Sequence, residues 1–319
     1  MKILVLGWYG HNNIGDDSYK IAFPKLFPEH TFEFTSNISH NDYDCVVLGG
    51  GNVFSNDFLG QLRGLNKPVF GMSLGLDRET KNDVPFVHVY AREQQSLEWL
   101  KCQKTVCSFL PDFAFALEPD IERGKFLLSQ MGTLYEKKVA IVVNSYLING
   151  GQGQKGRESM AFLSFAYELA RGIDAANASF IFIPFGTEIP ADDRVANSWV
   201  ANKCKFDKKN VVIYGQYSVQ DTLNIISACD AMVSTRLHAT IFAHNAGIPF
   251  VDITHHNKNK SFLDLIGQKD SSIPYWGFSS ELFCTQLDRA LASPRTKNDL
   301  RSLLIKGCND IRFDQKLHY

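Results

Sequence analysis

Short apolar runs alternate with helical patterns along this chain of 319 residues, and this alternation limits the fold more than any other feature. The first part of the chain contains runs that predict short strands at Lys2–Leu6, Thr31–Thr35, Cys45–Leu48, Val69–Met72, Val87–Tyr90 and Val106–Phe109. Helical patterns lie between them at about Asp16–Leu26, Asn56–Leu65 and Glu93–Cys102. Buried strands with intervening helices predict a mostly parallel sheet covered on both faces.

The pattern starts again after the charged stretch Leu117–Lys137, which we interpret as the connection between two domains, residues 1–130 and residues 131–319. Strand and helix patterns then alternate at Val139–Val143, Ser159–Ile173, Phe180–Pro184, Arg194–Ala201, Val211–Tyr214, Asp221–Ala228, Ala231–Val233, His238–Asn245 and Phe250–Ile253. The sequence therefore predicts an α/β fold in two halves. Ligands of such sheets bind at the carboxyl ends of the strands, and in this chain we also expect binding between the two halves.

The charge balance excludes some classes of partner. The 33 Lys and Arg residues and 34 Asp and Glu residues give a formal charge of −1, which argues against a nucleic-acid binder while leaving room for a small basic pocket. The seven cysteines form no C-x-x-C pair, so we expect reduced thiols and neither a disulfide framework nor a metal site. No apolar run has the ~20 residues of a membrane span, and we expect a cytoplasmic protein without an integral membrane segment.

Two glycine-rich loops follow strands in the first half. The loop GWYGHNNIGDD lacks the G-x-G-x-x-G spacing, but its glycines allow close approach of a ligand and the helix behind it favours anions. The alternative is a tight turn with Asp16 or Asp17 as the helix cap. The second loop, GGGNVF, makes room for a ligand or for the backbone of the opposite domain. The expected ligand contacts in the two loops are Gly10, Asn12, Asn13, Gly15, Asp16, Gly49, Gly50, Gly51 and Asn52.

A third glycine-rich loop opens the second half. Gly151, Gly153 and Gly156 match G-x-G-x-x-G, but the strand ends several residues earlier, which makes the match weak evidence for a nucleotide. Lys155 and Arg157 could close over an anion. The alternative is a flexible surface loop.

The sharpest motif is STRLHATIFAHNAGIP, which begins where the strand Ala231–Val233 ends. Ser234 or Thr235 is expected to cap the following helix, so that Arg236 and His238 emerge beside a helix N-terminus. A fork of donors, an imidazole and a positive dipole end suit an oxyanion such as phosphate or carboxylate. The alternative is that both side chains make structural hydrogen bonds.

Three further basic features have weaker predictions. His244 is on a different face of the helix from His238 and is expected to be structural. His255 and His256 lie in a basic loop with no ligand spacing for a metal. Arg92 also lies at a strand end, where it could bind an anion together with Arg236. The alternative is that it pairs with Glu93 or Asp112.

Taken together, these motifs resemble the polysaccharide pyruvyl transferase family. The resemblance covers Gly7 to Pro249 and rests on GWYGHNNIGDD, GGGNVF, AREQQSLEWL, LPDFAFAL and STRLHATIFAHNAGIP, in the family's order. The segment Gly71–Leu76 departs from the family's more polar pattern. The resemblance implies two facing Rossmann-like domains in a GT-B-like architecture, with the acceptor side in residues 1–130 and the donor side in residues 131–319.

The resemblance also implies an activity, in the biosynthesis of polysaccharides such as exopolysaccharide. A family member transfers the pyruvyl group of phosphoenolpyruvate to two hydroxyls of a sugar, which forms a cyclic ketal and releases phosphate. We assign His238 and Arg236 to catalysis, and Arg92, Leu237, Lys155, Arg157 and the two glycine-rich loops to substrate binding. No metal and no cofactor beyond the donor substrate is expected. The acceptor is left open among a glycoside, a lipid-linked sugar and a nucleotide-linked sugar.

Two alternatives compete with pyruvyl transfer. A GT-B glycosyltransferase would use a nucleotide sugar, but the helix after Arg236 lacks the expected Glu, and only Asp252 and Asp264 follow. A non-catalytic carbohydrate-binding protein would not need to retain an intact Arg-Leu-His sequence.

Overall fold

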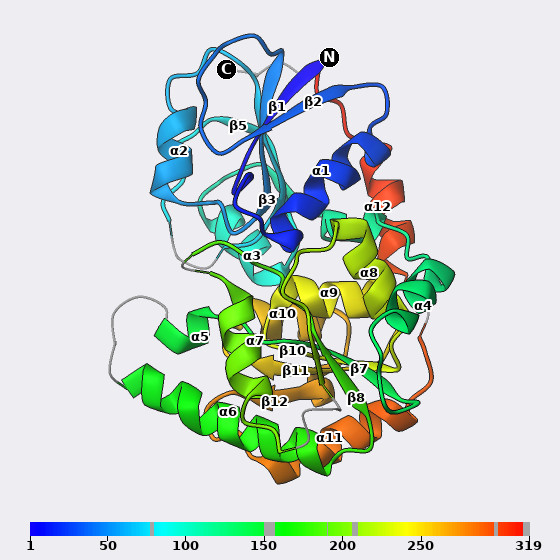
Figure 1. Cartoon of the computed structure of the whole chain (residues 1–319). Coiled ribbons are helices and arrows are strands. Elements are labelled where there is room, and N and C mark those ends of the chain that lie inside the picture. Colours follow the sequence, from blue (N-terminus) through cyan, green and yellow to red (C-terminus); the bar gives the residue numbers. More distant parts are fainter. Residues whose placement is uncertain (77–79, 150–156, 190, 206–209, 297–298, 315–319) are drawn as a thin grey trace. The chain divides into compact units, whose positions relative to one another are not determined.

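The chain forms two compact units, each built around a six-stranded parallel sheet (Figure 1). The computed structural model describes residues 1–76, 80–149, 157–189, 191–205, 210–296 and 299–314. Unit 1 comprises Met1–Leu117 together with the chain from Asp299 onward, and unit 2 comprises Glu118–Asn298. The predicted α/β class with two parallel sheets is confirmed.

Unit 1 has the strand order β2-β1-β3-β4-β5-β6. The strands are β1 (Lys2–Leu6), β2 (Thr31–Thr35), β3 (Cys45–Gly51), β4 (Val69–Leu74), β5 (Phe86–Ala91) and β6 (Cys107–Phe109). The helices are α1 (Ile14–Leu26), α2 (Asn56–Leu62), α3 (Gln94–Cys102), the 3₁₀ helix η1 (Phe113–Ala116) and α12 (Leu300–Cys308). Strand β3 is buried along its whole length, as expected for a central parallel strand with helices on both faces.

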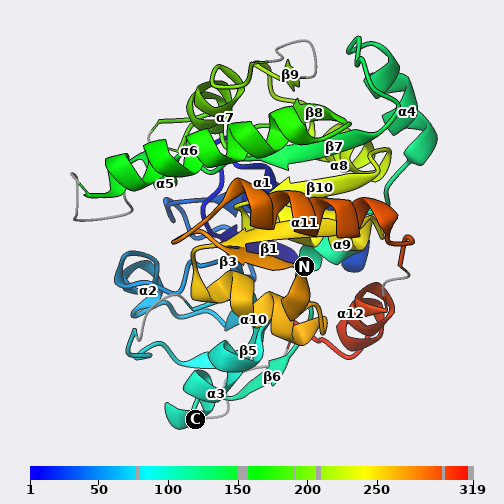
Figure 2. The ribbon, with the colours of Figure 1, turned by 90° about the horizontal axis from the view of Figure 1, so that it is seen from below.

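Unit 2 has the strand order β12-β11-β10-β7-β8-β9. Its strands are β7 (Lys138–Val142), β8 (Ser179–Phe182), β9 (Asn210–Val212), β10 (Ala231–Ser234), β11 (Phe250–Thr254) and β12 (Ser272–Pro274). Its helices are α4 (Ile121–Ser129), α5 (Tyr146–Asn149), α6 (Arg157–Ala175), α7 (Asp193–Ala201), α8 (Val219–Ser227), α9 (Leu237–Asn245), α10 (Asn257–Leu265), η3 (Lys269–Ser271) and α11 (Ser280–Ala292). Helices α6 and α11 pack against each other (Figure 2) and share one apolar core with α7 and the sheet.

The division between the units differs from the predicted boundary at residues 130 and 131. Helix α4 lies in the stretch that we interpreted as a connection, but it packs against α8 of unit 2. The Asp120 N–H donates to Asn224 Oδ1 at 2.8 Å, and Arg123 pairs with Asp221 at 3.1 Å. Helix α12 returns to unit 1, where it contacts η1 and buries Leu304. These helices are short and amphipathic, so the sequence does not show which sheet they cover.

The state of the cysteines and the length of the helices can be compared with what the sequence predicts. All seven cysteines are free thiols, and Cys45, Cys229 and Cys308 are buried. Within the described residues, no helix has the length and apolar character needed to cross a bilayer.

Candidate functional site

Each sheet has a point where the order of its strands reverses, and ligands of parallel α/β sheets bind at such points. In unit 2 the chain proceeds from β7 to β8 and β9 on one side, and from β10 to β11 and β12 on the other. In unit 1 the reversal lies between β1 and β3, with β2 on one side and β4 to β6 on the other. The loops that leave the carboxyl ends of β7 and β10, and of β1 and β3, therefore define two candidate sites.

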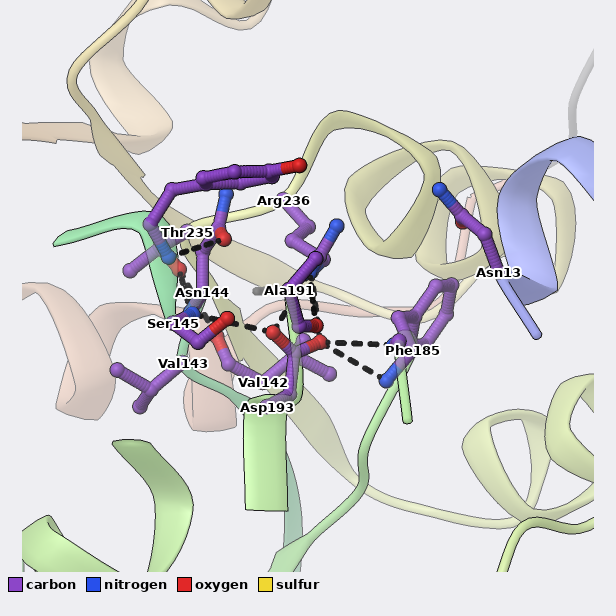
Figure 3. A network of polar contacts seen from close by, with 12 residues as sticks. Asn13, Val142, Val143, Asn144, Ser145, Phe185, Ala191, Asp193, Thr235 and Arg236 are labelled. Atoms are coloured by element: carbon purple, nitrogen blue, oxygen red, sulfur yellow. Dashed lines mark hydrogen bonds and ion pairs between the residues drawn. The ribbon is translucent and has the colours of Figure 1, made fainter. Parts of the chain in front are cut away.

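In unit 2, Arg236 is fixed by Asp193, the first residue of α7 (Figure 3). Asp193 is completely buried, and its two carboxylate oxygens lie 2.6 Å from Arg236 Nη2 and 2.6 Å from Arg236 Nε. Arg236 Nη2 also donates to the Ala191 carbonyl at 3.3 Å. These contacts hold the plane of the guanidinium and leave its Nη1 outside the ion pair. The structural pairing that we gave as the alternative is present, and it orients the cation.

The carboxylate of Asp193 also binds the backbone at the ends of the neighbouring strands. It accepts hydrogen bonds from the N–H groups of Ser145 at 3.1 Å, Phe185 at 3.0 Å and Gly186 at 3.0 Å (Figure 3). Both oxygens of this buried carboxylate therefore have hydrogen-bond donors. Asp193 thus links the loops after β7 and β8 to the loop after β10.

The expected caps of α9 are used elsewhere, so the prediction for Ser234 and Thr235 is wrong. Thr235 Oγ1 accepts from the Asn144 N–H at 2.7 Å and so joins the ends of β7 and β10. Ser234 Oγ accepts from the Arg236 N–H at 2.9 Å. Arg236 occupies the N-cap position, without a side-chain cap bond, and the first turn of α9 contains no acidic residue. The positive end of this helix therefore keeps its preference for an anion.

The remaining residues of the Arg-Leu-His sequence lie in the first turn of α9. His238 is partly exposed, whereas Leu237 is buried and packs in the core. The expected contact between Leu237 and a substrate stays a prediction. His244, at the other end of α9, is buried against Phe262, and burial lowers its pKa to about 4, which fits its expected structural role.

The basic loop expected after β11, with His255, His256, Lys258 and Lys260, is short, because Lys258 and Lys260 already belong to helix α10. Burial, reinforced by the charge of His256, lowers the pKa of His255 to about 3, so this imidazole is neutral at pH 7. Among the described residues, no group of three or more His, Cys, Asp or Glu side chains is arranged to hold a metal ion.

In unit 1, Arg92 is the centre of a buried network. Its exposed fraction is 5%, and its Nη1 donates to Asp112 Oδ2 at 2.7 Å. Its Nη2 donates to Asn52 Oδ1 at 2.9 Å, and the Tyr19 hydroxyl donates to Asp112 at 2.9 Å. Burial alone would lower the pKa of Arg92, but Tyr19 and Asp112 raise it above its usual range. Pairing with Asp112, one of the two alternatives, is confirmed.

The three glycines at the end of β3 make room for helix α1 of the same unit. A Cβ atom on Gly50 would lie 2.7 Å from the Tyr19 ring, and one on Gly51 would lie 2.9 Å from Asp16 Oδ1. Both glycines have positive φ angles, +82° and +81°, which side chains with a Cβ rarely adopt. The structure thus explains these glycines by packing against α1, and their expected contact with a ligand stays a prediction.

The loop after β1 leads into a capped helix. Asn13 is the N-cap of α1, because its side chain accepts from the Gly15 N–H at 3.0 Å. The alternative cap at Asp16 or Asp17 is therefore wrong. These two residues instead lie in the first turn of α1, where their negative charges offset the helix dipole.

Two of the predicted contacts lie outside what the structure describes, and several partners were missed. Lys155 and the side chain of Arg157 are outside the described residues. Sequence reasoning missed Asp193 and Tyr19 as partners of the two arginines. The pair Asp192–Asp193 before a helical pattern is a signal for a cap, but nothing in it points to an arginine 43 positions later.

Solved structures similar to the chain include two proteins named as epimerases and one named as a heptosyltransferase. UDP-GlcNAc 2-epimerase from Methanocaldococcus jannaschii, in complex with UDP-GlcNAc and UDP, is 11% identical with a TM-score of 0.66, over 97% of this chain and 98% of that one. Putative UDP-N-acetylglucosamine 2-epimerase from Listeria monocytogenes is 10% identical with a TM-score of 0.59, over 96% and 90%. ADP-heptose lps heptosyltransferase II from E. coli is 11% identical with a TM-score of 0.52, over 91% and 98%. These likenesses show a GT-B-like fold.

The comparison of sequences gives the family. No curated protein matches the chain. A model of the family described as polysaccharide pyruvyl transferase matches residues 5–257, which include both strand-order reversals and the Arg236–His238 segment. The protein therefore belongs to the polysaccharide pyruvyl transferase family.

Proposed function

We propose that the protein transfers the pyruvyl group of phosphoenolpyruvate to two hydroxyls of a sugar, forming a cyclic ketal and releasing phosphate. The observation that carries this proposal is the site at the start of α9. There a guanidinium oriented by the buried Asp193, an uncapped helix N-terminus and the partly exposed His238 lie within one helical turn. All three features favour a small anion that undergoes proton transfer.

The donor carries a phosphate and a carboxylate, and either group suits the positive site at the start of α9. Nη1 of Arg236 and the N–H groups of the first turn of α9 would bind one of the anionic groups. Ser145 lies beside the same ion pair, after the end of β7, because its backbone N–H donates to Asp193.

The chemical steps require one acid and one base function. His238, as the imidazolium, would transfer its proton to carbon 3 of the donor, and carbon 2 then becomes cationic. The first sugar hydroxyl attacks carbon 2 and loses its proton to the neutral imidazole. The second hydroxyl then attacks the same carbon as the bond from carbon 2 to the phosphate oxygen breaks, and the proton of this hydroxyl leaves with the phosphate, transferred through the imidazole of His238.

Arg92 has a different place in the proposal. Because it is buried and paired with Asp112, it acts as a positioning residue that holds Asn52 and the ends of β3 and β5. The loop after β1, with Gly10, Asn12 and Asn13, and the first turn of α1, with Gly15 and Asp16, are proposed to bind the acceptor, without a metal or a further cofactor.

His238→Ala tests the assignment most directly. The variant is incubated with phosphoenolpyruvate and a panel of glycosides, and released phosphate and the ketal mass gain are measured. We expect turnover to fall about 10²- to 10⁴-fold, the usual contribution of a general acid or base. His244→Gln is the matched control, since it alters a buried histidine on the same helix. Near-normal turnover of a folded His238→Ala protein, or tight binding of a nucleoside diphosphate with glycosyl transfer, would contradict the proposal.

A further inference from the structure

An exposed aromatic pair lies in the loop that joins β1 to α1. The indole of Trp8 stacks on the imidazole of His11, with ring centroids 3.9 Å apart and an angle of 18° between the planes. Trp8 is nevertheless 46% exposed, whereas its neighbour Tyr9 is buried. One face of the indole is therefore supported by protein, and a large part of its surface remains open to solvent.

The backbone on both sides of Trp8 is tied to the sheet. The Gly7 N–H donates to the Thr35 carbonyl at 2.9 Å, at the end of β2. The Tyr9 hydroxyl donates to the Gly49 carbonyl at 2.6 Å, at the end of β3. Positive φ angles at Gly10 (+83°) and Asn12 (+47°) turn the chain so that His11 returns under the indole. The aromatic pair is thus held by the fold, and little conformational entropy is lost when a ligand binds it.

The position of the pair in the sheet points to a ligand. Trp8 follows the carboxyl end of β1, and the strand order of unit 1 reverses between β1 and β3. An isolated exposed aromatic residue is common on protein surfaces, but a rigid one at a strand-order reversal lies where α/β sheets bind ligands.

The surroundings select an uncharged ligand. The segment from Gly7 to Tyr19 contains no Lys or Arg, and it contains Asp16 and Asp17 in the first turn of α1. Lys20, the next cation, pairs with Asp17 at 2.6 Å. The Asn13 side chain already caps the helix. A phosphate or carboxylate would be repelled here, while the asparagine and aspartate side chains suit the hydroxyls of a neutral ligand.

We propose that Trp8, supported by His11, is the stacking platform for the pyranose ring of the acceptor sugar. The face of a hexopyranose on which its C–H bonds are grouped is apolar and slightly positive, and it complements the negative face of an indole. The hydroxyls at the edge of the ring then reach the polar side chains of the loop. This inference rests on the proposed function, because it names the acceptor subsite of the same reaction.

Binding is tested without the donor, so that the result does not depend on turnover. Methyl hexopyranosides are titrated into the full chain, and tryptophan fluorescence of the wild type is compared with that of Trp8→Phe. We expect a fluorescence change in the wild type that is absent in Trp8→Phe. The dissociation constant, measured by calorimetry, should be close to normal in Trp8→Phe and raised about tenfold in Trp8→Ala, because one aromatic stacking contact is lost.

Trp199→Ala is the matched control, because Trp199 is 43% exposed and also contacts one aromatic ring, that of Phe162, but lies on helix α7. An unchanged dissociation constant in Trp8→Ala, or an equal loss in Trp199→Ala, would overturn the platform. Quenching of Trp8 by uridine monophosphate but not by the glycosides would also overturn it, in favour of a nucleobase.

Turnover then separates the two proposals. Trp8→Ala should raise the KM for the acceptor about tenfold and leave the KM for phosphoenolpyruvate unchanged. Glycoside binding that depends on Trp8, without phosphate release, would contradict the proposed function and keep a sugar platform. Phosphate release that depends on His238 but is indifferent to Trp8 would contradict the platform alone.

Discussion

Helix α1, which follows β1, and helix α9, which follows β10, both begin beside a strand-order reversal but differ in the residues at their N-termini. Helix α1 of unit 1 is capped by Asn13 and carries Asp16 and Asp17 in its first turn. Helix α9 of unit 2 has no side-chain cap and no acidic residue in its first turn, and Arg236 and His238 flank its start. One of these two helix N-termini is therefore offset by negative charge, and the other keeps its positive end. This contrast supports the proposal that the anionic donor binds at unit 2 and a neutral acceptor at unit 1.

The largest expected effect on activity is that of removing the Arg236 cation at the start of α9. We expect Arg236→Gln to lower kcat/KM for phosphoenolpyruvate at least about hundredfold, since charge-assisted hydrogen bonds contribute ~1.5–3 kcal/mol each. Steady-state release of phosphate measures the change, and urea unfolding verifies that the variant is folded despite the buried Asp193. Arg236→Lys should recover only part of the activity, because an ammonium cannot replace the fork.

The matched control is Arg194→Gln. Arg194 lies on the same helix as Asp193 and pairs with Asp192 at 2.7 Å, but it is more exposed than Arg236. Its loss should leave kcat/KM for phosphoenolpyruvate near normal. Equal losses in the two variants would mean that kcat/KM depends on the overall positive charge of unit 2 and not on Arg236 in particular. The assignment of the donor to Arg236 would then fail.

Acidic pH should lower the stability of unit 2 through His244, in the last turn of α9. Burial lowers the pKa of His244 to about 4, below the value of about 6.5 in an unfolded chain. The unfolded state therefore binds more protons between these values, and the stabilising contribution of the neutral imidazole is lost as the pH falls from 6.5 towards 4. Between pH 7 and pH 5 we expect a loss of about 2 kcal/mol from this group.

Urea unfolding of the wild type and of His244→Gln at both pH values measures that loss. The variant, which cannot titrate at this position, should show a smaller decrease in the free energy of unfolding by about the same 2 kcal/mol. The partly buried His255 has a pKa of about 3, chiefly because of desolvation, and continues to titrate in the variant. Identical pH dependences in the two proteins would show that His244 is not a source of acid sensitivity in α9.

The sequence predicted the parallel sheets and the family motifs better than it predicted the contacts of the motif residues. Periodicity depends on burial of each strand, which is local, so the runs at Val139–Val143 and Ala231–Val233 were found within one residue of the observed ends of β7 and β10. The partners of Arg236 and Arg92 lie 43 and 20 positions away, and only the fold brings them together. The caps failed for a related reason, because Thr235 bonds to the neighbouring strand end in place of its own helix.

The three glycines at the end of β3 also show how far the sequence alone predicts contacts. Three consecutive glycines indicated that something approaches the backbone closely, and that is correct for Gly50 and Gly51. The approaching groups are the ring of Tyr19 and the carboxylate of Asp16, from the helix of the same unit. A sequence shows that space is required, whereas the occupant of that space depends on tertiary packing.

The smallest expected effect concerns the cap of α1. Asn13→Ala removes the acceptor for the Gly15 N–H, and we expect the free energy of unfolding to fall by about 1 kcal/mol, as for other N-caps. Asn13→Asp keeps an acceptor and should retain most of this stability. Inorganic phosphate tests which of the two helix N-termini binds an anion. A ligand that binds the folded state raises the Tm, so phosphate should raise the Tm of the wild type and of Asn13→Ala equally. It should not raise the Tm of Arg236→Gln, which lacks the cation at α9. If Asn13→Ala also loses the phosphate-induced shift, the anion binds at unit 1, and the contrast between a neutralised α1 and a positive α9 has no bearing on which substrate each unit binds.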